Sequence, residues 1–177
     1  MDNNYIFQYW EGIQNGTVTV GKWIKTIYEI LVNGLKSGKW DFDEEKANKA
    51  INFIENFCHH SEGRNDLLKL ELWQKAIVSA IFGIMDKRTG YRQFREVFIV
   101  VARKNGKTLF AAAIAAYMAY IDGEYGAKVY FLAPKLDQAD LVYDAFYQIV
   151  QADDELDSIT KKRRSDIYIK EFNTSVK

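Results

Sequence analysis

Apolar residues in the first part of the chain recur at the spacing expected of helices. One set occupies residues 24–35 and a second occupies residues 47–58, at intervals that place each set on one helical face. A polar break over residues 61–66 closes this region. The pattern therefore predicts an N-terminal helical segment over residues 1–66.

From residue 67 onward the chain alternates between two kinds of pattern. Helical spacing returns over residues 70–84, 107–120 and 136–149. A continuous apolar run rich in β-branched residues, typical of a buried strand, occupies residues 97–102, and residues 129–133 and 166–169 are predicted as a second and a third strand. Strands that alternate with helices are typical of a parallel α/β sheet. Residues 67–177 are therefore predicted to form part of an α/β domain.

The charge and cysteine content restrict what the chain could bind and where it works. Its 177 residues carry 24 basic and 24 acidic side chains, so the formal net charge is zero and any contact with DNA must be local. The single cysteine, Cys58, excludes an internal disulfide framework and favours a cytosolic protein. We find no signal-peptide pattern and no apolar run near the ~20 residues of a membrane span, so no membrane contact is expected.

The residues that carry chemistry lie between the first predicted strand and the helix that follows it. Gly106, Lys107 and Thr108 form the end of a P-loop, the phosphate-binding motif also called Walker A. In such a loop the lysine meets the β- and γ-phosphates, the threonine hydroxyl ligates Mg²⁺, and the helix N-terminus favours the anion. The three residues therefore predict a site for a nucleotide with Mg²⁺.

The motif is incomplete, because Val101 stands where the standard P-loop has its first glycine. A basic surface turn is the alternative interpretation, but such a turn does not need the wholly apolar helix that follows here. Arg103 adds a charge that could face the γ-phosphate in the transition state. The sequence is equally compatible with an arginine that is only solvated or ion-paired. The candidate nucleotide contacts in the loop are Arg103, Lys104, Asn105, Gly106, Lys107 and Thr108, with Arg103 and Lys107 as the candidate catalytic residues.

The segment VARKNGKT, residues 101–108, is similar to the deviant phosphate loop of phage large terminases, the ATP-driven motors that package DNA into capsids. Further segments of the chain resemble this family in order and spacing: residues 11–16, 41–45, 70–74, 81–83, 132–134 and 138–139. The resemblance therefore covers nearly the whole chain. It implies a P-loop ATPase fold, with a partial parallel sheet after the helical segment, and with ATP and Mg²⁺ as cofactors.

The resemblance also implies roles for individual residues and partners for the protein. Lys107 and Thr108 would hold the phosphates and Mg²⁺, and Arg103 would act on the γ-phosphate. Gln74, which by spacing alone is a polar residue on a helix, would read the adenine. The implied partners are double-stranded DNA, a portal protein and a small terminase subunit. The implied assembly is a homo-oligomeric ring in the cytoplasm of a bacterial host.

The chain departs from the family toward its end. The family continues to an apolar strand that ends in Asp-Glu, and residues 153–155 do not supply it because residues 149–152 continue a helical face. The basic run at residues 161–164 is interpreted as a solvated loop, with DNA contact as the less favoured alternative. We therefore expect ATP binding with negligible hydrolysis by this chain alone. Two alternatives stay open: another P-loop ATPase, such as a helicase-like translocase or a nucleotide kinase, and a non-catalytic truncated prophage product.

Overall fold

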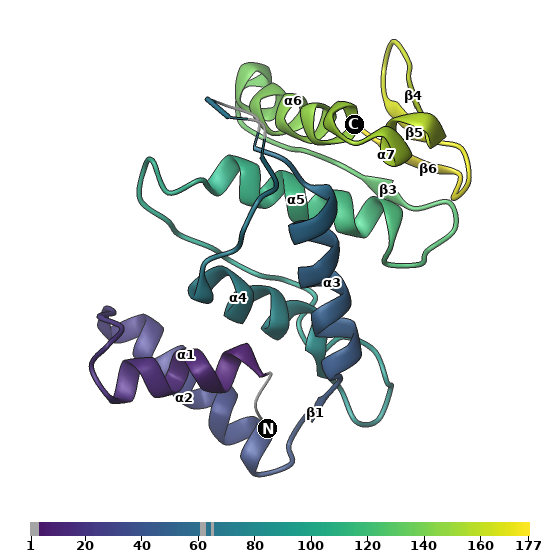
Figure 1. Ribbon diagram of the computed structural model, residues 1–177. Coiled ribbons are helices and arrows are strands. Elements are labelled where there is room, and N and C mark those ends of the chain that lie inside the picture. Colours follow the sequence, from purple (N-terminus) through teal and green to yellow (C-terminus); the bar gives the residue numbers. More distant parts are fainter. Residues whose placement is uncertain (1–3, 61–62, 65) are drawn as a thin grey trace. The chain divides into compact units, whose positions relative to one another are not determined.

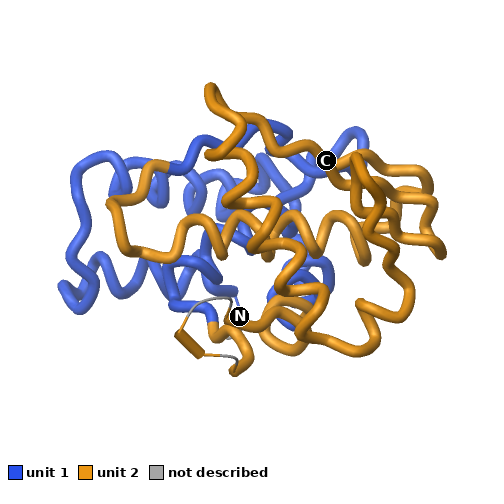
Figure 2. Tube along the Cα trace, turned by 90° about the horizontal axis from the view of Figure 1, so that it is seen from above, with its two compact units in different colours: residues 1–52, 70–99 blue, residues 53–69, 100–177 orange. Residues whose placement is uncertain are grey.

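The computed structural model describes residues 4–60, 63–64 and 66–177, and its contacts divide the chain into two compact units (Figure 2). Unit 1 comprises residues 1–52 and 70–99, and unit 2 comprises residues 53–69 and 100–177. Part of the predicted polar break, Ser61, Glu62 and Asn65, lies outside the described residues. The expected division into domains at residues 66 and 67 follows sequence order rather than contacts, and it stays a prediction.

Unit 1 is mainly helical (Figure 1). Helix α1 (Tyr5–Gln14) packs against α2 (Lys22–Lys36) and α4 (Leu72–Gly83). Two short strands, β1 (Asp41–Phe42) and β2 (Ile84–Met85), pair in antiparallel fashion. The core of this unit consists of Ile6, Tyr9, Trp10, Ile13, Tyr28, Leu31, Val32, Ala76 and Ile84.

The helices expected in the first part of the chain are confirmed, and one more precedes them. The set at residues 24–35 lies in α2, and the set at residues 47–58 lies in α3 (Glu44–Phe57) apart from its last residue. Helix α1 begins after Asn4, whose side chain accepts a hydrogen bond from the Ile6 N–H at 3.0 Å. This helix buries Ile6, Tyr9, Trp10 and Ile13, a spacing of three and four residues that is itself a helical signal.

Unit 2 combines helices with a four-stranded sheet. Helix α5 (Lys107–Tyr120) packs against α6 (Leu136–Ala152), and a short α7 (Asp154–Ile159) follows α6. The strands lie in the order β3 (Lys128–Val129), β6 (Thr174–Val176), β5 (Ile167–Ile169) and β4 (Thr160–Lys162). Among the described residues no helix has the length and apolar character needed to cross a bilayer.

The sheet of unit 2 is mixed, which corrects the expectation of a parallel sheet. Strands β3 and β6 are parallel, whereas β5 is antiparallel to both β6 and β4. The reason is the connection between β4 and β5, a tight turn in which the Arg163 N–H donates to the Asp166 carbonyl at 2.8 Å. Strands joined by so short a turn must run in opposite directions, since a parallel pair needs a long crossover.

One face of this sheet is buried against helices. Ile167, Ile169, Thr174 and Val176 have no exposed surface, and α5 contacts both β3 and β6. The Phe131 ring, just beyond β3, lies 6.1 Å from that of Phe146 in α6. Side chains alternate between the faces of a strand, so residues adjacent to the buried ones belong to the opposite face.

The predicted buried strand at residues 97–102 is wrong. This segment belongs to no strand, and Phe98 and Val100 are 93% and 79% exposed. β-Branched residues favour extended backbone, but a strand also needs a neighbour with which to form hydrogen bonds. No strand of the described part of the chain pairs with this segment. The run at residues 129–133 forms a strand only in its first residue, although the Phe131 N–H extends the pairing by donating to the Lys177 carbonyl at 2.8 Å.

Two further expectations concern the chain after α6. Residues 149–152 are helical, as predicted. Asp153 caps α7 by accepting hydrogen bonds from the Glu155 and Leu156 N–H groups, each at 3.0 Å. The predicted solvated loop at residues 161–164 needs correction, because Lys161 and Lys162 lie in β4, although all four basic residues are exposed.

A buried hydrogen bond joins α5 to β4. The Thr160 hydroxyl donates its proton to the Leu156 carbonyl at 2.6 Å. The Tyr120 hydroxyl, 2.6 Å from Thr160 Oγ1, must therefore be the donor in the bond between these two side chains. Burial raises the pKa of Tyr120 above its usual value, which keeps this hydroxyl protonated and able to donate. The last residue of α5 is thereby bonded to the first residue of β4.

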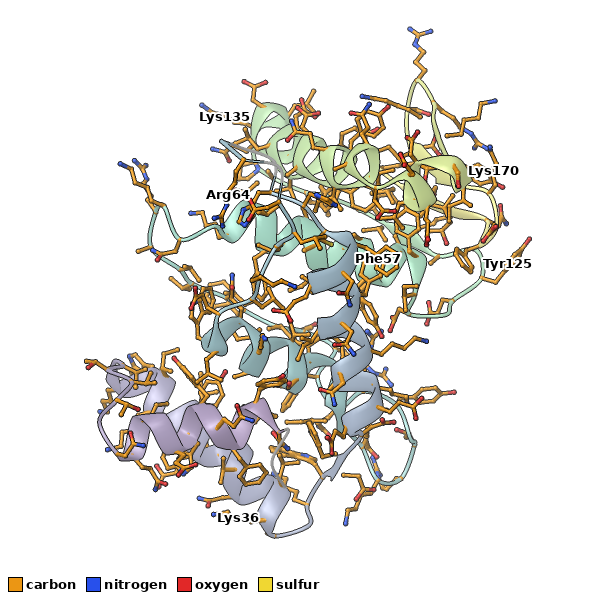
Figure 3. The ribbon with its side chains drawn as sticks, viewed as in Figure 1. Lys36, Phe57, Arg64, Tyr125, Lys135 and Lys170 are labelled. Atoms are coloured by element: carbon orange, nitrogen blue, oxygen red, sulfur yellow. The ribbon has the colours of Figure 1, made fainter. Side chains whose placement is uncertain are left out.

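Replacing Tyr120 with phenylalanine should destabilise the chain by about 1 kcal/mol, because the ring contacts remain while one buried hydrogen bond is lost. Urea unfolding measures the change. Tyr125→Phe is the matched control, since Tyr125 is 78% exposed (Figure 3) and should tolerate the same loss of a hydroxyl. Equal effects of the two substitutions would contradict a stabilising Tyr120–Thr160 bond.

Candidate functional site

The loop before α5 has a backbone conformation that few sequences adopt. Lys104 and Gly106 both have left-handed backbone angles, with φ of 68° and 64°. The Asn105 side-chain amide donates to the carbonyls of Ala102 and Arg103, at 3.2 and 3.3 Å. The loop is therefore held from within by a side chain that occupies two of its carbonyl oxygens.

Helix α5 begins directly after this loop, with Gly106 as its N-cap. No side chain caps the helix, and the first N–H groups of any α-helix lack partners within it. Within the described residues, the N–H groups of Lys107, Thr108 and Leu109 donate no hydrogen bond, whereas the Phe110 N–H donates to Gly106 at 2.9 Å. The start of α5 therefore offers unused donors together with the positive end of the helix dipole.

The charge around the loop is positive and uncompensated. Between residues 97 and 121 the sequence contains Arg103, Lys104 and Lys107 and no acidic residue. All three cations are exposed, and none forms an ion pair with the described part of the chain. Thr108 is half-buried at the second position of the helix. This combination of cations, free N–H groups and a hydroxyl can bind a polyanion and a Mg²⁺ ion held by that anion.

Gln74 belongs to unit 1 and is considered separately from the loop. It is 7% exposed at the third position of α4. Its Oε1 accepts a hydrogen bond from the Glu71 N–H at 2.8 Å, and the Glu71 side chain accepts in return from the Gln74 backbone. This reciprocal pair is a capping box, so one end of the Gln74 amide has a structural role.

Acidic groups do not gather into a metal centre in the residues that the structure describes. No group of three or more His, Cys, Asp or Glu side chains there could hold a metal ion. Asp153 has its carboxylate engaged at the α7 cap.

Comparison with known proteins agrees with the resemblance read from the loop. The family described as terminase large subunit, ATPase domain, matches residues 72–177, which is more than half of the chain. The chain belongs to this family. The crystal structure of the HK97 bacteriophage large terminase is similar to this terminase chain, with a TM-score of 0.64 and 24% sequence identity.

The similarity to the HK97 protein covers 75% of this chain and 26% of that one. The terminase chain therefore spans about a quarter of that protein's length, and at this identity the likeness shows the fold alone. The common fold is a mixed α/β fold with a small mixed sheet. No curated protein matches the chain.

Sequence reasoning named the candidate site residues of this terminase chain but missed the hydrogen bonds that Asn105 and Gln74 form. Asn105 orders the loop through its own side chain, which no spacing rule indicates. The capping box of Glu71 and Gln74 could have been found, since an acceptor followed three residues later by glutamine is its signature. The roles assigned to Gln74, Arg103 and the other loop residues stay predictions.

Replacing Gly106 with alanine should destabilise the chain by about 1–2 kcal/mol, because a Cβ is unfavourable in the left-handed conformation. No atom lies within 4 Å of the added Cβ, so backbone strain alone is tested. Gly21→Ala is the matched control, because Gly21 is also an uncapped N-cap in open space but has a φ of −73°. Urea unfolding should show the larger loss for Gly106→Ala, and equal losses would contradict this assignment.

Proposed function

We propose that this chain is the ATP-binding part of a phage DNA-packaging motor, a terminase large subunit that couples ATP hydrolysis to translocation of double-stranded DNA. The observation that carries the proposal is the start of α5, where unpaired N–H groups and unpaired cations adjoin a glycine with a left-handed backbone. Family membership favours ATP among the polyanions that such a site could take.

The loop residues divide the work of binding a triphosphate. Lys107 supplies a point charge to the β- and γ-phosphates, and the N–H groups from Lys107 to Leu109 donate to their oxygens. The Thr108 hydroxyl ligates Mg²⁺ in this proposal, an ion that would neutralise part of the phosphate charge. Arg103 stabilises the charge that develops on the γ-phosphate in the transition state, and Gln74 reads the adenine edge with the part of its amide that Glu71 does not engage.

The proposed setting is the cytoplasm of a bacterial host. The proposed partners are double-stranded DNA, a portal protein and a small terminase subunit, with a ring of identical subunits as the assembly. The setting, the partners and the ring are proposed from family membership, and not from any contact that the structure describes. The single chain has formal net charge zero, so it would be recruited to DNA through local contacts rather than through its overall field.

Lys107→Ala should weaken binding of a fluorescent ATP analogue about ten- to a hundred-fold, because one charge-assisted contact with phosphate contributes about 1.5–3 kcal/mol. Lys135→Ala removes the same charge from another exposed lysine, at the start of α6 (Figure 3), and should leave the affinity unchanged. Equal affinities of Lys107→Ala and the parent chain would end the proposal for the loop.

Phosphate release from Mg²⁺-ATP by residues 1–177 alone should not exceed that of Lys107→Ala. Hydrolysis needs a residue that positions the attacking water, and the carboxylate of Asp153, one candidate for that role, is engaged at the α7 cap. A phosphate-release assay on both chains measures this. Turnover that depends on Lys107 would show that the chain supplies its own catalytic carboxylate, and Asp154 and Glu155 would then be the first candidates to replace.

A further inference from the structure

The face of the unit 2 sheet that lies opposite the buried one carries a row of polar side chains. Strand register places Lys128, Ser175, Tyr168 and Lys161 opposite one another across β3, β6, β5 and β4. Both lysines are exposed, and the serine and tyrosine are half-buried. The row therefore presents a cation at each edge of the sheet with an aromatic ring between them.

The turn between β4 and β5 adds two more cations, Arg163 and Arg164. Aromatic rings contact cations on both sides of the hairpin. The Arg163 guanidinium lies 3.6 Å from the centre of the Tyr168 ring, and the Lys162 ammonium lies 4.0 Å from that of Tyr147. The Tyr168 hydroxyl in turn donates to Asn173 at 2.9 Å. Contacts of this kind already restrain the cation. It therefore loses less side-chain entropy when it binds a partner.

Few direct ion pairs neutralise the basic run of this hairpin. Residues 160–165 contain four consecutive basic residues and no acidic one, although the acidic first turn of α7 lies just before β4. The one carboxylate paired with the run is that of Asp166, 3.9 Å from Arg163, among the ion pairs of the described residues. Four adjacent cations repel one another, and a polyanionic partner would remove that repulsion.

From this arrangement we infer that the β4–β5 hairpin, with Lys161, Lys162, Arg163 and Arg164, binds the phosphate backbone of duplex DNA. Arginine guanidinium groups and lysine ammonium groups are the usual donors to phosphate oxygens. The hairpin carries no set of amides arranged to read base edges, so binding is independent of DNA sequence. The choice of duplex DNA as the partner rests on the proposed function.

The hairpin has a fixed position within unit 2. Thr160, the residue before the basic run, accepts the hydrogen bond of Tyr120 at the end of α5. The loop between β4 and β5 projects away from α6 (Figure 1), while Lys135 lies at the opposite end of that helix (Figure 3). The phosphate loop precedes the first residue of α5, at the opposite end of that helix from Tyr120, so its cations are separate from those of the hairpin and substitutions can test the two groups independently.

The test is fluorescence anisotropy of a short labelled duplex of random sequence with the 177-residue chain, in the absence of nucleotide and over about 50–200 mM salt. Lys161→Ala/Arg164→Ala should weaken binding by at least about ten-fold, since each lost contact to a phosphate contributes a charge-assisted hydrogen bond. The slope of log affinity against log salt should also fall by about 2, because each contact contributes roughly 0.9.

Lys49→Ala/Lys135→Ala is the matched control, because it removes two exposed lysines that do not belong to the hairpin and should leave both quantities unchanged. Equal losses of DNA affinity in the two double variants would show that only the net charge matters and would overturn the inference. Unchanged DNA affinity in the hairpin variant would overturn it as well. Loss of DNA affinity in Lys107→Ala would place the DNA at the phosphate loop instead and would also overturn it. Binding of the ATP analogue, measured in the two double variants, should be unaffected, so the DNA inference and the nucleotide site can fail separately.

Discussion

The burial of α5 is the constraint on which unit 2 depends. The helix is apolar almost all round, and its large residues Phe110, Tyr117 and Tyr120 are buried along with most of its alanines. Burying a side chain of the size of Phe110 contributes about 1.5–3 kcal/mol, so the helix is fixed along its length. Its first residue, Lys107, is exposed, as are Ala111 and Met118 further along the helix. A helix held in this way presents its N-terminal N–H groups in one place without the help of a capping side chain.

The electrostatics of the phosphate loop follow from the same constraint. A buried helix must be apolar, and for this reason α5 contributes no carboxylate that could pair with Arg103, Lys104 or Lys107. The cations before it keep their charge unneutralised, and Asn105 occupies two nearby carbonyl oxygens that would otherwise repel an anion. The scarcity of acidic residues around the loop is thus a product of packing as well as of chemistry.

Local patterns in the sequence predicted the helices well, because a helix forms its hydrogen bonds within a few residues. The predicted helix at residues 107–120 coincides with α5, and Gly106, Lys107 and Thr108 were found because they are consecutive. Strand pairing joins distant residues, so the exposed run at residues 97–102 and the antiparallel β4–β5 hairpin could not be predicted from apolar runs alone. The amide bonds of Asn105 depend on backbone geometry that residue spacing does not encode.

Helix α5 also connects the phosphate loop to the sheet through a continuous stretch of hydrogen-bonded backbone. Its 14 residues span about 21 Å at 1.5 Å per residue, and its ladder of hydrogen bonds makes it stiff along its axis. One end is the first turn after the phosphate loop, and the other is joined through Tyr120 to Thr160. A displacement of the first turn along the helix axis would therefore be carried through the helix to Tyr120 and, through its hydrogen bond, to β4.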